Sequence, residues 1–416
     1  MTLNKSVNYK VLSLYLKYGY IALPGFKTIY NNKKINTWLK PPYKTSLKTN
    51  TDECLQYFKK RCETIVKRLK KKRKKICLLL SSGQDSRLIY KVLEEIVIKH
   101  NYQKNFFCFT GRISHFNDDY DESAIIKKFW NIKPINHKII TINKKNIFKK
   151  IFLANQINHQ PVNGLPNIIF LSCVEKICKK FGNNKVHIVT GAGDNIFFNA
   201  LDKQAKKLQK KGSSLISAQD GSIFKNSTYL TSKYEKFSDK LFKKIKTKQH
   251  FIERHLLHKY INQMAFNYRG PKVISEFKNI FKYFQTDFFA PFTEKKFIEL
   301  ILSLKKENLH DGKNKKTFIH DSNIIIDPKQ KKIVGLKVIS PQREIIYENR
   351  KKILQMINTS VLIKKNIVDK KKIFNQFNSY LNDFKRFKKN KKMFQRFNSY
   401  SVWKFLSSEI FLRGCK

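Results

Sequence analysis

One strand–loop–helix pattern constrains the fold of this chain more than any other segment. An apolar run at residues 76–80 stops at Ser81-Ser82-Gly83-Gln84-Asp85-Ser86, and a helical pattern of apolar residues follows. Small hydroxyl residues and one glycine allow backbone N–H groups to approach an anion, and the following helix adds its positive N-terminal end. The pattern therefore predicts an anion-binding loop, although a serine-rich turn alone is also typical of an ordinary connection.

The composition of this loop narrows the choice of anion. Asp85 supplies a carboxylate for the Mg²⁺ that accompanies a polyphosphate, so we expect ATP or its pyrophosphate as the ligand. The loop has neither the spacing and Lys of a Walker A loop nor the Gly-x-Gly-x-x-Gly of a dinucleotide site, which argues against both of those classes. It resembles instead the SGGxDS loop of the ATP pyrophosphatases, with Ser82 in place of the first glycine.

Strand and helix patterns alternate along the first half of the chain. After an amphipathic helix at 51–75 and the strand beginning at residue 76, strands are predicted at 105–110, 137–142 and 186–190, and helices at 88–100, 121–130, 145–157 and 168–181. This alternation predicts an α/β fold, a parallel sheet with helices on both faces. Ligands of such sheets bind beyond the carboxyl ends of the strands.

A second glycine-bearing turn follows the strand at 186–190. It reads Gly191-Ala192-Gly193-Asp194-Asn195 and is expected at the same end of the sheet as the first loop. Asp85 and Asp194 then form the predicted metal pair, because Mg²⁺ is usually held by one or two carboxylates together with substrate phosphates. By itself the turn is more typical of an ordinary tight turn with an Asx cap.

The high positive charge and the seven cysteines do not by themselves indicate a binding partner, a disulfide framework or a metal site. The 416 residues carry a formal charge of +56, but the excess is mostly Lys and is spread along the chain, so we expect no specific nucleic-acid partner. Seven cysteines without a Cys-x-x-Cys pair argue against a disulfide framework and a zinc site. No apolar run is long enough to span a bilayer and no signal-like pattern begins the chain, so we expect a cytoplasmic protein without a membrane partner.

Taken in order, seven sequence blocks resemble the synthetase domain of the asparagine synthetases. The blocks are residues 81–86, 121–122, 190–198, 290–295, 311–316, 340–344 and 402–406. Residues 15–24 resemble the segment that joins the glutaminase domain to the synthetase domain in that family. The resemblance implies an adenine nucleotide alpha hydrolase-like (PP-loop) fold. It divides the chain into a lead-in (1–75), an ATP-binding synthetase domain (76–344) and a mainly helical C-terminal extension packed on the core (345–416).

The resemblance also assigns roles to individual residues. ATP and its pyrophosphate would be held by the loop, by backbone at two strand ends and by the second turn; these residues are Leu80, Ser81, Ser82, Gly83, Asp85, Ser86, Thr110, Thr190 and Gly191. Lys316 matches the family lysine that offsets negative charge during adenylation. The implied reaction activates a carboxylate, by default aspartate, as an acyl-adenylate with release of pyrophosphate. Ammonia or an amine then forms the amide and AMP leaves.

Several positions depart from the family pattern. The catalytic cysteine and the domain of a glutaminase are absent before the loop, so we expect ammonia, supplied free or by a separate glutaminase, rather than glutamine as the nitrogen source. The second turn is one residue shorter, with Ala192 near the position of a family Glu and Asn195 at the closing Glu. His320 stands where an Arg is usual. The amidation step is therefore less securely predicted than ATP binding.

These departures leave three interpretations open. The first is an asparagine synthetase-like ligase. The second is a relative that closes lactams or macrolactams on peptides, or amidates sugars or natural products, which the altered second turn favours. The third, of another class, is a degenerate ATP-binding or RNA-associated protein, suggested by the charge; the joint presence of Asp85, Asp194 and Lys316 argues against it.

Overall fold

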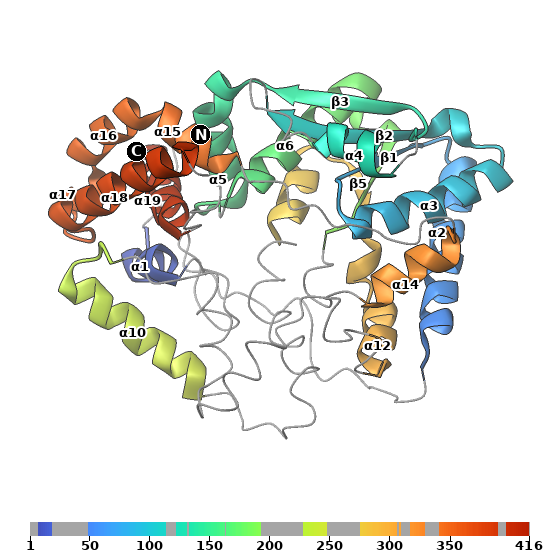
Figure 1. Cartoon of the computed structure of the whole chain (residues 1–416), viewed down its shortest axis with the longest axis horizontal. Coiled ribbons are helices and arrows are strands. Elements are labelled where there is room, and N and C mark those ends of the chain that lie inside the picture. The colour runs from blue at the N-terminus through green and yellow to red at the C-terminus, as the bar shows by residue number, and fades with distance from the viewer. Residues whose placement is uncertain are drawn as a thin grey trace.

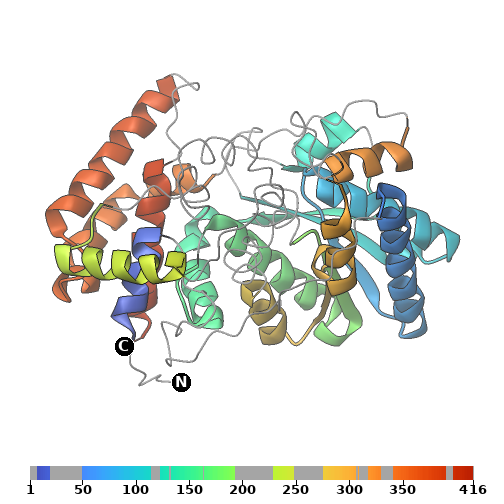
Figure 2. The ribbon, with the colours of Figure 1, turned by 90° about the horizontal axis from the view of Figure 1, so that it is seen from below.

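The computed structural model of the chain describes most of its predicted elements (Figure 1). The described residues are 7–18, 49–113, 122–130, 133–162, 164–192, 228–247, 275–305, 308, 317–328, 341–389 and 397–415. Figures 1 and 2 show the sheet and its helices on one side of the molecule, and the C-terminal helices grouped with the N-terminal helix α1 on the other.

The sheet is parallel throughout, as predicted. Its strands are β1 (Lys75–Leu79), β2 (Phe106–Ile113), β3 (His137–Ile142), β4 (Val186–Thr190) and β5 (Asp287–Phe289), in the order β3-β2-β1-β4-β5. The predicted strands at 137–142 and 186–190 are confirmed at both ends, and β2 runs three residues beyond its predicted end. Strand β5 was not predicted, because three residues are too few to show a strand pattern.

Helices follow the strands as the alternation predicted. They are α3 (Gln84–Lys99), α4 (Glu122–Trp130), α5 (Ile147–Asn158) and α6 (Leu165–Phe181), with short 3-10 turns at Gln103–Asn105, Lys144–Asn146 and Asn183–Lys185. The predicted start of the first of these helices, Leu88, is wrong. Extended backbone at Gly83 ends the loop, so helix α3 starts at Gln84 and takes Asp85 and Ser86 into its first turn.

Hydrophobic clusters cover both faces of the sheet. Successive side chains of a strand point to opposite faces, and in β1 Cys77 joins one cluster while Ile76 and Leu78 join the other. Helices α2 (Thr51–Lys71), α3, α12 (Lys295–Ser303) and α14 (Thr317–Ile326) contribute to the cluster of Ile76, and helices α1 (Tyr9–Tyr18), α5 and α6 to the cluster of Cys77. A 3-10 turn at Pro291–Thr293 connects β5 to α12.

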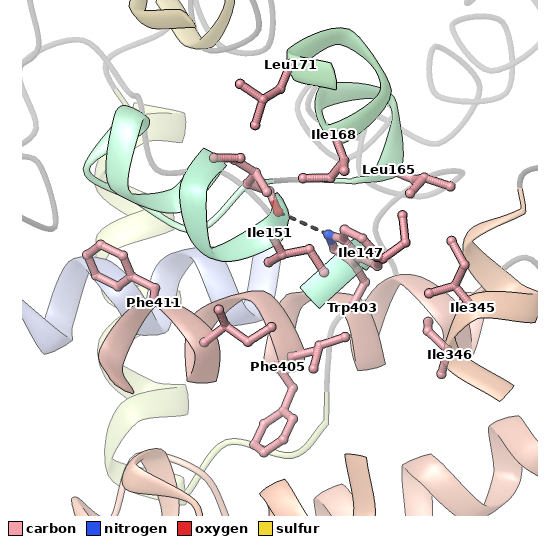
Figure 3. Close-up of a cluster of buried hydrophobic side chains, with 14 of the residues drawn as sticks. Ile147, Ile151, Leu165, Ile168, Leu171, Ile345, Ile346, Trp403, Phe405 and Phe411 are labelled. Atoms are coloured by element: carbon pink, nitrogen blue, oxygen red, sulfur yellow. Dashed lines mark hydrogen bonds between the residues drawn. The ribbon is translucent and has the colours of Figure 1, made fainter. Parts of the chain in front are cut away.

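The remaining described helices pack on the side of α1, α5 and α6. They are α10 (Ser232–Thr247), α15 (Gln342–Glu348), α16 (Arg350–Asn358), α17 (Val361–Lys364), α18 (Lys370–Lys389) and α19 (Phe397–Arg413). Helix α19 is buried along nearly its whole length, and its Trp403 donates from Nε1 to the carbonyl oxygen of Val162, 3.1 Å away (Figure 3). Buried polar side chains of α19 are hydrogen-bonded inside the core: Lys404 donates to the carbonyl oxygen of Lys17, and Glu409 accepts from Ser360.

The hydrophobic clusters cross the predicted segment boundaries. Helix α2, from the predicted lead-in, shares a cluster with α3, and helix α19, from the predicted extension, shares one with α5 and α6. The division at residues 75 and 344 and the PP-loop fold both stay predictions. None of the helices that the structure describes combines the length and the apolar character needed to cross a membrane.

Candidate functional site

The order of the strands selects one position along the sheet. β2 and β3 lie on one side of β1, whereas β4 and β5 lie on the other, so the direction in which the chain adds strands reverses between β1 and β4. Leu79 of β1 is paired with Thr190 of β4, and the loops that follow these two residues leave the sheet side by side. In open α/β sheets such a reversal is the usual ligand position, so we call these two loops and their neighbours the carboxyl-edge site.

The first loop gathers hydroxyl and carboxylate oxygens around a glycine. Ser81 Oγ and Ser86 Oγ are 2.7 Å apart, and the amide of Gly83 donates to Ser81 Oγ over 3.4 Å. A Cβ atom at position 83 would lie 3.4 Å from Ser81 Oγ and 3.8 Å from Asp85 Oδ2. Gly83 has an ordinary φ of −74°, so the backbone itself does not require glycine there. The missing side chain instead leaves the space between these oxygens open.

The second turn lies close to the first. A Cβ atom on Gly191 would lie 3.6 Å from Ser86 Oγ and 3.9 Å from the amide nitrogen of Ser86, at the start of α3. Thr190 is buried, and its hydroxyl accepts a hydrogen bond from the amide of Ala192 at 3.3 Å. The two turns that the sequence predicted at one end of the sheet therefore approach each other closely at the N-terminus of α3.

Thr110 of β2 lies beside the end of β1. Its buried hydroxyl lies 2.9 Å from the carbonyl oxygen of Leu80 and 2.8 Å from Nε2 of His137. The carbonyl can only accept, so the hydroxyl donates its one proton to Leu80, and His137 donates from Nε2 to the hydroxyl. The Leu80 amide is also used, since it donates to the carbonyl oxygen of Phe109 at 2.8 Å. Leu80 therefore has only the second lone pair of its carbonyl oxygen for a ligand.

The side chain of Glu122 accepts a hydrogen bond from a backbone amide of the first loop. This interaction was not predicted from the sequence. The acceptor is Glu122 Oε2, and the donor is the backbone nitrogen of Ser82, 3.1 Å away. A carboxylate thus takes one of the N–H groups expected to face phosphate, at the start of α4. The sequence placed Glu122 in a family block but showed no reason for it to reach a loop 40 residues away.

Arg87 fastens α14 to the carboxyl-edge site. The side chain is fully buried; its Nη1 donates to Asn323 Oδ1 at 3.1 Å and its Nη2 contacts Asp327 Oδ2 at 2.7 Å. Asn323 in turn donates from Nδ2 to the carbonyl oxygen of Gln84 at 3.2 Å. These bonds hold a helix from residue 317 onward against the first turn of α3. The sequence analysis missed Arg87, because its partners lie 236 and 240 residues away.

Most of the predicted site residues lie within the part of the chain that the structure describes. Leu80, Ser81, Ser82, Gly83, Asp85, Ser86, Thr110, Thr190 and Gly191 all lie at the carboxyl ends of β1, β2 and β4. Asp194 and Lys316, together with Gly193 and Asn195, lie outside the described residues. Within the described ranges, no group of three or more His, Cys, Asp or Glu side chains could hold a metal ion.

Comparisons with known proteins leave the family of the chain open. Models of protein families and curated protein sequences were both compared with it, and neither comparison found a match. The carboxyl-edge site is thus characterised by its own geometry: two strand-end turns that lie close together, a cluster of hydroxyl groups, a helix N-terminus and the carboxylates of Asp85 and Glu122.

Proposed function

We propose that the protein is an ATP-dependent carbon–nitrogen ligase that activates a carboxylate as its adenylate and forms an amide from it. The close approach of Gly191 to Ser86 at the reversal of strand order carries the proposal. It brings together two turns that the sequence placed at one end of the sheet, at the position where α/β sheets bind ligands.

The phosphates of ATP would lie over the first turn of α3. Ser81 and Ser86 offer hydroxyl groups, Gly83 leaves space beside them, and the α3 N-terminus adds backbone N–H groups and the positive end of its dipole. Thr190 and Gly191 would border the nucleotide from β4. The carbonyl oxygen of Leu80 and the backbone of Thr110 would face it from β1 and β2.

The oxygen donors of the site suit Mg²⁺. A carboxylate with hydroxyl groups nearby is a hard donor set, and Mg²⁺ is commonly held by one or two carboxylates and substrate phosphates. Asp85 would be one ligand, and we propose Asp194 as the second. The ion would neutralise charge on the pyrophosphate.

In the first chemical step, a carboxylate oxygen of the substrate attacks the α-phosphorus of ATP and pyrophosphate leaves. Two anions must meet, so a fixed cation near the α-phosphate lowers the barrier. We assign this role to Lys316. The residue that follows it, Thr317, begins α14, and Arg87 holds α14 against the phosphate loop. Arg87 is thus a positioning residue in this proposal.

In the second step, ammonia or an amine attacks the carbonyl carbon of the adenylate, and AMP leaves with one oxygen of the original carboxylate. Aspartate is the default substrate. A peptide or other small-molecule carboxylate would undergo the same two steps.

An isotope experiment tests this reaction directly. The chain is incubated with MgATP, ammonium and ¹⁸O-labelled aspartate, or with other labelled carboxylates, and the products are analysed by mass spectrometry. We expect one ¹⁸O in AMP and none in inorganic phosphate, because the attacked atom is the α-phosphorus. Label in inorganic phosphate, or unlabelled AMP from attack by water, would contradict adenylation of the carboxylate.

A further inference from the structure

A cavity opens at the opposite, amino edge of the sheet. Its volume is about 700 Å³, and it lies where β4 and β5 begin. The C-terminal end of α2 and helical residues 275–283 supply much of its lining. We call it the amino-edge cavity. None of the residues assigned to the carboxyl-edge site lines it.

His187 lines this cavity with an unused imidazole. The residue is only 3% exposed, and neither ring nitrogen has a hydrogen-bond partner among the described residues. His187 pairs with Ile76 of β1 and with Asp287 of β5, so two neighbouring strands fix its backbone. A buried polar ring without a partner is costly unless a ligand or water satisfies it.

Cationic side chains outnumber carboxylates among the described residues that line the cavity. Four cationic side chains line it: Arg68, Lys72, Lys278 and Lys282. Asp287 is the carboxylate in the lining, and it is already paired with Lys74, 2.6 Å away. Burial lowers the pKa of His187 to about 4. The nearby charges of Arg68 and Lys74 also lower this pKa, whereas Asp287 raises it. The ring is therefore neutral at pH 7. A neutral imidazole among cations can donate one hydrogen bond to an anion.

We propose that the amino-edge cavity binds the phosphate group of a small molecule, with His187 donating to a phosphate oxygen and Lys72, Lys278 and Arg68 offsetting its charge. Several cations favour a multiply charged anion, and Arg suits the geometry of phosphate. The volume falls in the range of small-molecule sites and exceeds what one free phosphate fills, so we infer a phosphate monoester. The inference does not depend on the proposed ligase activity.

Calorimetric titration of the full chain with glycerol 2-phosphate and with inorganic phosphate, at fixed ionic strength and pH 7, tests the site. We expect the double variant Lys72→Ala/Lys278→Ala to weaken binding of both at least tenfold. The control Lys60→Ala/Lys71→Ala also removes two charges, from exposed positions of α2 that do not line the cavity, and should change affinity less than twofold. Equal losses in the two double variants would overturn the proposal.

Two further measurements test whether phosphate binds in the amino-edge cavity and not elsewhere on the protein. Bound phosphate should raise the pKa of His187, followed by NMR of its imidazole and assigned with the variant His187→Gln; an unmoved resonance at saturation contradicts the site. Asp85→Asn should leave phosphate affinity unchanged, whereas a change of affinity in that variant, in either direction, would place the anion at the carboxyl edge instead. Tighter binding of the monoester identifies an organic phosphate as the ligand, and equal affinity identifies free phosphate; both support a phosphate site.

Discussion

The two edges of the sheet would attract their proposed anions by different means. At the carboxyl edge, the groups available are backbone amides, the hydroxyls of Ser81 and Ser86, and the positive end of α3, beside the carboxylates of Asp85 and Glu122. At the amino edge, the attraction comes from long cationic side chains around one buried histidine.

Helix direction explains part of this difference. In a parallel sheet, the helix after a strand begins at the carboxyl edge, so α3 presents its N-terminus there. Helix α2 ends just before β1 and presents its C-terminus at the amino edge, where Arg68 and Lys72 stand next to the negative end of the dipole. Binding at the carboxyl edge should therefore depend on precise backbone placement, and binding at the amino edge on the number of side-chain charges.

The largest expected effect concerns Arg87, the buried side chain that holds α14 against α3 at the carboxyl edge. We expect Arg87→Met to lower the free energy of unfolding by about 3–5 kcal/mol, because it leaves the buried part of a charged hydrogen-bond network unpaired. Arg61→Met is the matched control, since Arg61 bonds Glu294 at 2.7 Å but is 40% exposed; it should cost less than about 1 kcal/mol. Urea unfolding of both variants measures the difference, and equal losses would mean that Arg87 does not anchor α14.

The next effect concerns pH at the amino edge. The pKa of His187 is lowered by burial to about 4, below its ordinary value of 6.5, so between these pH values the unfolded state binds a proton that the folded state does not. Stability should rise with pH across this window, by up to about 1.4 kcal/mol per pH unit. Comparing wild type with His187→Gln by urea unfolding isolates this contribution. Identical pH profiles would show that His187 is not buried in a neutral form.

The smallest effects compare two Thr-Gly pairs at the carboxyl ends of β2 and β4. A Cβ atom on Gly111 would lie 2.5 Å from Ile169 Cγ2 and 2.9 Å from Cys173 Sγ of α6, so Gly111→Ala should cost about 1–3 kcal/mol. Gly191→Ala meets only ordinary contacts and should change stability by less than about 1 kcal/mol. It should still weaken ATP binding, because the methyl group faces Ser86. Thermal unfolding and ATP titration check both, and a larger stability loss in Gly191→Ala would contradict the described geometry.

The sequence predicted the carboxyl edge far better than the amino edge. Strands β1 to β4 and the contact of their loops follow from local patterns, because each loop is a short continuous segment that comes directly after a strand. Arg87 and Glu122 were missed, since their partners are set only by tertiary packing. The lining of the amino-edge cavity runs from Arg68 to Phe288 and has no local signature. In the sequence, His187 is one residue of a strand pattern, and only the tertiary structure shows that it lines a cavity.

The exchange of labelled pyrophosphate into ATP, in the presence of a carboxylate, tests the central claim most directly. We expect Asp85→Asn to lower the exchange rate at least a hundredfold without changing the unfolding temperature. Asp52→Asn, an exposed aspartate in the first turn of α2, and the amino-edge variant Lys72→Ala/Lys278→Ala should retain wild-type rates. Exchange that survives Asp85→Asn, or that is lost in the amino-edge variant, would contradict the assignment of ATP to the carboxyl edge.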